Sequence, residues 1–313
     1  MKLAFLYAGQ GSQHAGMGAD LYAAYPAFRA VFDAAPADLA LKELCFFGPE
    51  ERLGQTQHTQ PCMVAFAAGM TALLRERGIR PDYAAGLSLG EYSALHAAGV
   101  FDAQTAIGLV RFRGRAMEQA ARGRPGTMAA VLKLDRSALQ QVCAAAQACG
   151  TVSIANYNCP GQLVIGGDAA AVERACVLAL QAGARRCQPL RVSGAFHTSL
   201  MAPAGDALRE RFRSLRFGPM AFPVLFNCTG DCLRPGQSIP DLLERQVQSS
   251  VYLEDTIRRL EALGVDTVLE IGPGRVLSGF VKKTAPSIRT LAVETADELE
   301  AAVAALKGAS TCV

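Results

Sequence analysis

The sequence of 313 residues is half hydrophobic and carries 19% charged residues, which is typical of a globular protein and excludes a disordered one. The net charge is only +3, and no basic stripe interleaved with aromatic residues is present, so nucleic acid is not expected as a partner. No apolar run approaches the roughly 18 residues that span a bilayer, so we expect no membrane segment and a cytoplasmic location.

The ten cysteines are scattered along the chain, and most lie among alanine, valine and leucine residues. This pattern predicts small buried side chains in a reducing compartment. Cys228 and Cys232 form a close pair, but no second Cys or His pair accompanies them. We therefore expect no metal site.

Residues 1–7 predict a buried strand that ends at the glycine-rich loop Gly9-Gln10-Gly11-Ser12-Gln13. Ligands in α/β sheets bind at the carboxyl ends of strands, so this loop is a candidate binding element. Farther along, Thr59-Gln60-Pro61 carries the signal of a helix start, a polar cap with proline near the first turn. The apolar run from Met63 to Leu74 indicates that this helix is buried.

The stretch Gly86-Leu87-Ser88-Leu89-Gly90 fits the G-x-S-x-G pattern and leads directly into helix-forming residues. In a nucleophile elbow the serine lies on a strained strand-to-helix turn, and the flanking glycines let neighbouring backbones approach. Ser88 is therefore a candidate nucleophile. The alternative is a glycine-rich turn that merely precedes a helix.

The helix predicted after the elbow has an apolar stripe that includes Leu109 and Met117, and Arg113 falls on this stripe. Arg111 and Arg115 project away from it. An arginine that faces the core is costly unless an anion or a carboxylate meets it. Arg113 is therefore either an anion-binding residue or half of an internal salt bridge.

Beyond a linker at residues 122–126, the sequence predicts strands at 127–134, 152–157, 162–165 and 185–192. Asp135 and Asp168 can each cap a helix between these strands. The resulting order βαββαβ predicts a ferredoxin-like subdomain at residues 126–192. It is inserted into a larger α/β subdomain formed by residues 1–125 and 193–313.

After the insertion, the chain passes through a junction loop that contains His197. The sequence beyond this loop predicts a strand at 223–226, a helical stretch that contains Gln246, and a strand at 267–271. A helix that includes Lys282 and Lys283 follows, and the residues after Gly308 are expected to form a loose tail.

A serine hydroxyl is a poor nucleophile unless a base removes its proton, and the chain has four histidines. His96 lies eight residues after Ser88 on the same predicted helix, about 12 Å along the axis, and cannot reach back. His14 and His58 are interpreted as loop or surface residues. His197 remains as the candidate base, although its position alone fits a structural histidine at least as well.

Taken in order, these stretches resemble the malonyl-CoA:acyl-carrier-protein transacylase family of fatty-acid synthesis and the related acyltransferase domains of polyketide synthases. The resemblance covers nearly the whole chain and is specific because its landmarks are ordered. They are Gly9-Gln10-Gly11-Ser12-Gln13, Thr59-Gln60-Pro61, Gly86-x-Ser88-Leu89-Gly90-Glu91-Tyr92, Arg113-Gly114, Asn156-x-Asn158-x-Pro160-Gly161-Gln162, Ala195-Phe196-His197 and Glu270-x-Gly272-Pro273-Gly274. The family usually has histidine where this chain has Leu87, a change that bears on pocket shape and acyl selectivity.

The resemblance implies an α/β-hydrolase-like large subdomain with a parallel sheet and an inserted ferredoxin-like small subdomain. It also implies a ping-pong reaction, in which malonyl-CoA acylates Ser88, CoA leaves, and the phosphopantetheine thiol of an acyl carrier protein takes the malonyl group. The expected partners are therefore malonyl-CoA and acyl carrier protein. No cofactor is expected, and a monomer is expected.

The resemblance places the catalytic base at His197, held by the backbone carbonyl of Gln246 rather than by an acid, which makes a Ser-His dyad. The candidates for the two oxyanion donors are the backbone amides of Gln10 and of Leu89, the residue after the nucleophile.

The resemblance also assigns substrate contacts. Arg113 would form a bidentate pair with the free carboxylate of malonate. Phe196 would narrow the pocket against an α-methyl branch, and Asn158 is a further candidate for substrate binding. Lys282 and Lys283 are candidates for a docking face toward an acidic carrier protein, although each is more simply explained as a solvated charge.

Other functions remain open on the sequence. An esterase or thioesterase with the same elbow would use water as acceptor and would need an acid between Ser88 and His197, for which Asp135 and Asp168 are the candidates. A free-standing acyltransferase that serves a polyketide synthase would share these site residues. A non-catalytic scaffold that binds a carrier protein is disfavoured by the intact set of Ser88, His197, Arg113 and Gln10.

Overall fold

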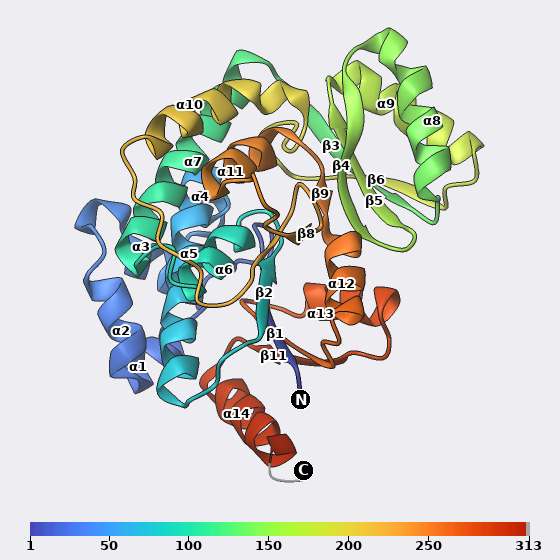
Figure 1. The fold of residues 1–313 in the computed structure, drawn as a ribbon. Helices are drawn as coiled ribbons and strands as arrows, with labels where there is room; N and C mark the ends of the chain where they lie inside the picture. The colour runs from blue at the N-terminus through green and yellow to red at the C-terminus, as the bar shows by residue number, and fades with distance from the viewer. Residues whose placement is uncertain (311–313) are drawn as a thin grey trace. The chain divides into compact units, whose positions relative to one another are not determined.

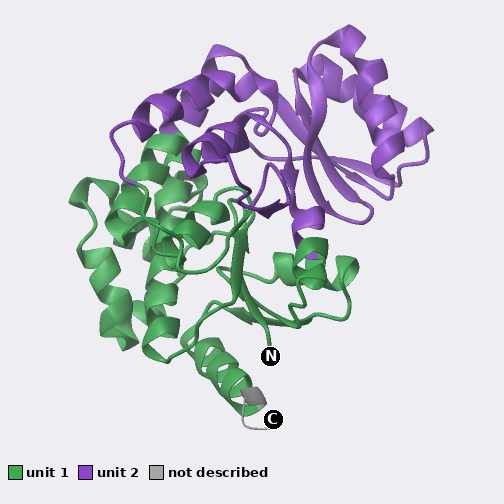
Figure 2. Cartoon of the chain, viewed as in Figure 1, with its two compact units in different colours: residues 1–114, 217–225, 258–313 green, residues 115–216, 226–257 purple. Residues whose placement is uncertain are grey.

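The structure, a computed structural model, describes residues 1–310 (Figure 1). The chain divides into two compact units, which are described separately (Figure 2). Unit 1 comprises Met1–Gly114, Phe217–Leu225 and the chain from Arg258 onward, and unit 2 comprises Arg115–Arg216 and Phe226–Ile257. Among the helices of residues 1–310, none is both long and apolar enough to cross a membrane.

Unit 1 is built on a parallel four-stranded sheet in the order β11-β10-β1-β2. Its strands are β1 (Leu3–Tyr7), β2 (Tyr83–Gly86), β10 (Thr267–Ile271) and β11 (Arg289–Val293). Every residue of β1 and β10 is buried, as expected for central strands that are covered on both faces. The predicted mixed α/β fold with a parallel sheet is confirmed.

The helices of unit 1 surround this sheet (Figure 1). They are α1 (Ala19–Ala24), α2 (Pro26–Asp33), α3 (Leu41–Phe47), α4 (Glu50–Leu53), α5 (Thr56–Glu76), α6 (Gly90–Ala97), α13 (Val276–Thr284) and α14 (Ala296–Ser310), with the short helix η1 (Ala37–Leu39). Because α14 runs to Ser310, the loose tail predicted after Gly308 is wrong at residues 309 and 310. The remainder of that predicted tail, 311–313, lies outside the described residues.

Helix α5 begins at Thr56, earlier than the start predicted at Thr59-Gln60-Pro61. Pro61 therefore lies inside the helix. Its ring nitrogen has no hydrogen to donate to Gln57, so the helix gives up one backbone bond there. Burial compensates for this loss, because α5 is enclosed from Thr59 through Thr71.

Unit 2 contains a five-stranded sheet in the order β6-β3-β5-β4-β9. Its strands are β3 (Thr127–Leu132), β4 (Val152–Cys159), β5 (Gln162–Gly167), β6 (Arg186–Pro189) and β9 (Val251–Tyr252). All pairings are antiparallel except that of β4 with β9. Helices α8 (Arg136–Ala146) and α9 (Ala169–Gln181) cover one face of this sheet (Figure 1).

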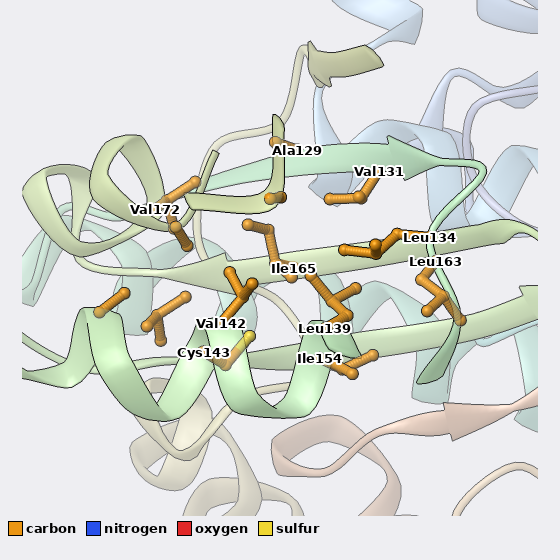
Figure 3. Close-up of a cluster of buried hydrophobic side chains, with 14 of the residues drawn as sticks. Ala129, Val131, Leu134, Leu139, Val142, Cys143, Ile154, Leu163, Ile165 and Val172 are labelled. Carbon is orange, nitrogen blue, oxygen red and sulfur yellow. The ribbon is translucent and has the colours of Figure 1, made fainter. Parts of the chain in front are cut away.

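The core of this part of unit 2 lies between the sheet and the two helices (Figure 3). Alternate strand residues such as Val131, Leu163 and Ile165 point toward Leu139 and Val142 of α8. This two-residue period is the one expected for strands with a single covered face. The remaining elements of unit 2 include η2 (Gln147–Cys149), η3 (Ser199–Met201), α10 (Ala202–Phe212), β8 (Asp231–Cys232) and α11 (Ile239–Gln248).

Three elements lie at the boundaries between the units. Helix α7 (Ala103–Gly123) begins in unit 1 and ends in unit 2, β7 (Leu225–Phe226) joins them, and α12 (Leu253–Ala262) returns the chain to unit 1. Unit 2 thus extends on both sides of residues 126–192, the segment predicted as an insertion.

The nine described cysteines are free thiols. The prediction of buried thiols is confirmed for five of them and wrong for Cys149, which is exposed at the end of η2. Cys176, Cys187 and Cys232 are partly exposed, and Cys312 lies outside the described residues. The buried set comprises Cys45, Cys62, Cys143, Cys159 and Cys228.

Glu270 is a fully buried carboxylate at the end of β10, and it caps helix α13. Its two carboxylate oxygens accept hydrogen bonds from the backbone amides of Leu277 (2.9 Å) and Ser278 (2.7 Å). Burial raises the pKa of Glu270, and these hydrogen bonds oppose part of the rise. The landmark Glu270-x-Gly272-Pro273-Gly274 therefore joins a strand to a helix start, whose first amides have no partner within the helix.

We expect Glu270→Ala to lower the free energy of unfolding by about 2–4 kcal/mol, because two buried amides lose their acceptors. Urea unfolding at neutral pH measures this. Glu270→Gln keeps one acceptor oxygen and should fall between the wild type and the alanine variant. An alanine variant as stable as the wild type would show that the cap does not contribute.

Candidate active site

Ser88 lies on the turn between β2 and α6, and its backbone has a φ of +53°. This left-handed conformation is rare for a residue with a Cβ and marks local strain. The turn is fixed by the Leu87 amide, which donates to Tyr7 O (3.0 Å), and by the Gly90 amide, which donates to Leu87 O (2.9 Å). The geometry is that of a nucleophile elbow and not of a relaxed glycine turn.

The two flanking glycines are required by close approach. A Cβ on Gly86 would lie 2.0 Å from the carbonyl carbon of Gly90, and a Cβ on Gly90 would lie 2.2 Å from Tyr7 O. Gly9 is constrained in the same way, since its Cβ would lie 2.5 Å from Leu87 O. The carboxyl ends of β1 and β2 are therefore packed backbone against backbone, which brings the glycine-rich loop beside the elbow.

Two backbone amides near Ser88 are candidates for binding an anion. Within residues 1–310, neither the Leu89 nor the Gln10 amide donates to an acceptor of the chain. Leu89 immediately precedes the first residue of α6, where the helix dipole favours negative charge. The Gln10 side chain is held to one side, because its Nε2 donates to Thr56 Oγ1 (3.0 Å).

Arg113 is 1% exposed, and it is the largest by volume of the fully buried side chains among the described residues. Its Nη2 donates a hydrogen bond to Ser88 Oγ at 3.2 Å. The prediction that Arg113 faces the core is confirmed, and the buried guanidinium lies against the candidate nucleophile. Burial lowers the pKa of Arg113, while nearby Tyr92 and Glu91 favour its charged form.

The neighbours of Arg113 explain how α7 presents it. Arg111, on the opposite side of α7, pairs with Asp38 at 2.5 Å and is partly exposed. A Cβ on Gly114 would lie 2.9 Å from Thr56 O, so the glycine lets α7 approach the first turn of α5. In the Arg113-Gly114 pair, the glycine thus permits the close packing of α7 against α5 that positions the arginine side chain.

Glu91 and Tyr92 were not identified as site residues from the sequence. Both are fully buried in the first turn of α6, and the Tyr92 ring lies 5.3 Å from the Arg113 guanidinium carbon. Burial raises the pKa of Tyr92, so its hydroxyl stays protonated at neutral pH. A glutamate and a tyrosine directly after G-x-S-x-G, with an arginine on a core-facing stripe nearby in sequence, are the signal that could have found them.

In unit 2, His197 lies on the junction loop, is 4% exposed and has a φ of +60°. The loop is held on both sides of it, because the Thr198 hydroxyl donates to Ala195 O (2.6 Å) and the Phe196 amide donates to Gly194 O (3.0 Å). His197 is therefore a second residue of the predicted site that the fold keeps in a strained conformation.

The tautomer of His197 follows from its partner. Nδ1 lies 2.9 Å from the backbone oxygen of Gln246, which can only accept, so Nδ1 carries the proton. Gln246 is near the end of α11, where carbonyl groups have no partner within the helix. Neutral His197 consequently has its lone pair on Nε2, the nitrogen that can take a proton.

The other substrate-binding candidates have distinct surroundings. Phe196 is 6% exposed beside His197. Asn158 is 7% exposed in β4, and among residues 1–310 its Oδ1 meets no hydrogen-bond donor. Lys282 and Lys283 are exposed in the last turn of α13, in unit 1.

The remaining histidines have other partners. His14 is exposed and its ring joins Glu294 and Ala15 O, which together raise its pKa. His96 Nδ1 bonds to Phe101 O (3.0 Å), and burial lowers its pKa. His58, interpreted as a loop or surface residue, is partly exposed but lies in the first turn of α5 and not in a loop, for the same reason that the helix start was misplaced.

The two aspartates considered as a third catalytic member are used structurally. Asp135 caps α8, because its side chain accepts from the Ala138 amide (2.8 Å). Asp168 precedes α9 but makes no capping bond, so its predicted role as a cap is wrong. Instead it pairs with Arg124 at 2.7 Å and accepts from the Thr151 amide, which satisfies both of its oxygens.

Unit 1 therefore brings together Ser88, Arg113 and the amides of Gln10 and Leu89. Unit 2 brings together His197 and the Gln246 carbonyl, and Phe196 directly precedes His197 in the sequence.

Comparisons with known proteins show what the chain is similar to. The family described as acyl transferase domain matches residues 4–308. A malonyl CoA-acyl carrier protein transacylase of Bacillus subtilis is 43% identical over 309 residues, which is 98% of either chain. The range of the family match contains all the landmarks, from Gly9 to Gly274.

Solved structures give the same result. A crystal structure of malonyl CoA-acyl carrier protein transacylase from Clostridium perfringens superimposes with a TM-score of 0.95 at 34% identity, covering 99% of each chain. A malonyl-transacylase solved in complex with its type II polyketide synthase acyl-carrier protein superimposes with a TM-score of 0.93 at 38% identity, covering 97% of this chain and 99% of that one.

Proposed function

The chain belongs to the acyl transferase domain family and, within it, to the malonyl CoA-acyl carrier protein transacylases. On that premise we propose that it is the enzyme that transfers a malonyl group from malonyl-CoA to the phosphopantetheine thiol of an acyl carrier protein. The observation that carries the proposal is the strained Ser88, whose hydroxyl lies 3.2 Å from the buried Arg113 guanidinium. A nucleophile beside a buried cation suits an acyl group that bears its own carboxylate.

His197 acts as the general base. Its Nε2 takes the Ser88 proton while Ser88 Oγ attacks the thioester carbonyl of malonyl-CoA, and it returns that proton to the departing CoA thiolate. The Gln246 carbonyl holds the ring in the tautomer that this step needs. A neutral carbonyl fixes the tautomer without the added charge stabilisation that an aspartate would give the imidazolium.

The negative oxygen that forms during attack is stabilised by the amides of Leu89 and Gln10. Their lack of a partner in residues 1–310 and their positions beside Ser88 support this assignment. Loss of one such donor typically raises the barrier by about 3–4 kcal/mol.

The second half of the reaction reverses the roles. His197 Nε2 takes the proton of the phosphopantetheine thiol, the sulfur attacks the malonyl-Ser88 ester, and the proton returns to Ser88 Oγ as the ester bond breaks. Malonyl thioester and free serine result, and no cofactor takes part. Phe196 narrows the acyl pocket against an α-methyl branch, and Asn158 supplies a polar contact to substrate through its buried side chain.

The acyl carrier protein is the second partner. The complex of a similar malonyl-transacylase with its polyketide synthase carrier protein supports this, and also supports service to a polyketide synthase as a second candidate pathway. Carrier proteins of this kind are acidic, so Lys282 and Lys283, both exposed, contribute to the docking face. A panel of fatty-acid and polyketide carrier proteins, compared by kcat/KM, distinguishes the two pathways.

We further propose that unit 1 is an α/β-hydrolase-like subdomain and that β3 through β6 form a ferredoxin-like one. The order β6-β3-β5-β4 and the helices α8 and α9 on one face support the second assignment. The boundaries proposed are 1–125 and 193–313 for the large subdomain and 126–192 for the small one. A cytoplasmic monomer is the proposed state of the protein.

The test of carboxylate recognition is Arg113→Ala. Malonyl transfer should fall at least tens-fold, since breaking such a buried charge pair from one side costs about 2–5 kcal/mol. An acetyl group has no carboxylate, so acetyl transfer should hold or improve, and the ratio of malonyl to acetyl loading should collapse. Both are measured as kcat/KM for loading from the two CoA esters.

Arg111→Ala is the matched control, since it removes a partly exposed arginine two residues away on the same helix. Its loading ratio should remain that of the wild type. Equal decline of malonyl and acetyl loading in Arg113→Ala would instead identify Arg113 as a structural residue.

A further inference from the structure

Two residues close to the nucleophile in sequence, Glu91 and Tyr92, lie in the first turn of α6. The Glu91 amide donates to Ser88 O (3.2 Å), and the Tyr92 amide donates to Leu89 O (3.0 Å). These two hydrogen bonds fix the start of α6 relative to the backbone of the elbow. A side chain that packs against Tyr92 is therefore positioned relative to Ser88 by the backbone of the first turn of α6.

Arg113 is that residue. Its guanidinium carbon lies 5.3 Å from the centre of the Tyr92 ring while its Nη2 reaches Ser88 Oγ at 3.2 Å. Both side chains are excluded from water, at 1% and 0% exposure. The attraction between a cation and an aromatic face is strongest in such a desolvated site.

The position of the guanidinium matters because malonate is short. Its carboxylate is one methylene away from the carbonyl carbon that Ser88 attacks, and reacting atoms must approach to about 3–3.5 Å. Arg113 reaches α6 from α7, along a flexible side chain of its own. A contact that fixes the guanidinium therefore determines whether Arg113 can bind the carboxylate while Ser88 attacks the carbonyl carbon of the same malonyl group.

We propose that Tyr92 is a positioning residue for malonyl selectivity: its ring holds the Arg113 guanidinium at the distance from Ser88 that a malonyl group requires. Glu91, fully buried in the same turn, favours the charged form of Arg113. This inference rests on the proposed function, in which Arg113 binds the malonyl carboxylate. It adds a residue that acts through Arg113 and does not itself touch substrate.

The first test compares Tyr92→Leu with Tyr92→Phe. Tyr92→Leu should lower the ratio of malonyl to acetyl kcat/KM about ten- to thirty-fold, whereas Tyr92→Phe, which keeps the ring, should restore it to within about three-fold of the wild type. A purely structural tyrosine would lower loading by both acyl groups in parallel and leave the ratio unchanged, which would overturn the inference. Phe66→Leu is the matched control, since this fully buried ring packs edge-on against Phe28 at 5.7 Å.

Fluorinated phenylalanines at position 92 serve if the leucine variant does not fold. Fluorine withdraws charge from the ring face and leaves its shape nearly intact, so the attraction for a guanidinium weakens with each fluorine. The malonyl to acetyl ratio should fall stepwise from phenylalanine to the trifluoro derivative. A flat series would show that the ring only fills space.

A double-mutant cycle separates this inference from the proposed function. In the Arg113→Ala background, Tyr92→Leu should change the loading ratio no further, because the group it positions is gone. Additive effects would overturn the inference and leave the role of Arg113 intact. If Arg113→Ala alone leaves the ratio unchanged, carboxylate recognition by Arg113 fails, and the positioning role fails with it.

Discussion

Wild-type protein mixed with malonyl-CoA, without an acceptor, should gain a single malonyl group by intact mass, and Ser88→Ala should gain none. Alanine has no oxygen to form the ester, and the elbow leaves no other hydroxyl in the same strained position. Turnover with carrier protein should fall on the order of 10⁶-fold, as it does when the nucleophile of a serine protease is removed.

The control is Ser93→Ala, which removes a buried hydroxyl from α6, the helix that follows the elbow. It should form the adduct as the wild type does. An adduct that persists on Ser88→Ala would assign the nucleophile to another residue and would leave the strain at Ser88 without a function.

His197→Ala should slow acylation of Ser88 and transfer to the carrier thiol together, each by at least about 10⁴-fold, because one imidazole serves both steps. In the wild type, activity should decline toward acid pH, since a protonated imidazole cannot accept the serine proton. That decline should disappear from the residual activity of the variant. Rapid-quench measurement of each half reaction across pH provides the comparison.

His14→Gln is the matched control, because His14 is exposed and its ring is engaged by Glu294. It should retain wild-type rates and the wild-type pH profile. A His197→Ala protein that kept most of its rate at neutral pH would show that another group is the base.

The sequence predicted the turn at Ser88 and the burial of Arg113 because both depend on local rules. The glycines at 86 and 90 mark where backbones must touch, and a 3.6-residue period places Arg113 among apolar neighbours. The family resemblance assigned Arg113 to the malonyl carboxylate, but the contact between Arg113 and Ser88 was not predicted. It depends on how closely α7 packs against α5, and Gly114 controls that distance across the fold.

Other features could not be read because tertiary packing overrides local propensity. Pro61 indicated a helix start, yet α5 begins five residues earlier, at Thr56, because burial of the helix compensates for the backbone bond lost at the proline. Asp168 had the pattern of a cap, but the bond to Arg124 is formed with a residue 44 positions away. Glu270 in an apolar strand gave no hint of its partners, since the amides it accepts belong to the next helix.

The three glycines packed at the elbow restrict how an enzyme of this kind can change its substrate. Gly9, Gly86 and Gly90 admit no side chain, because a Cβ at any of them would lie within 2.5 Å of a main-chain atom. Neither natural variation nor directed evolution can therefore replace these glycines, whichever acyl group is selected for. Leu87 occupies a position within this frame that does carry a side chain and is only half-buried. A library that varies residue 87 and keeps the three glycines would therefore test the proposed role of this position in acyl selectivity while preserving the turn that holds Ser88.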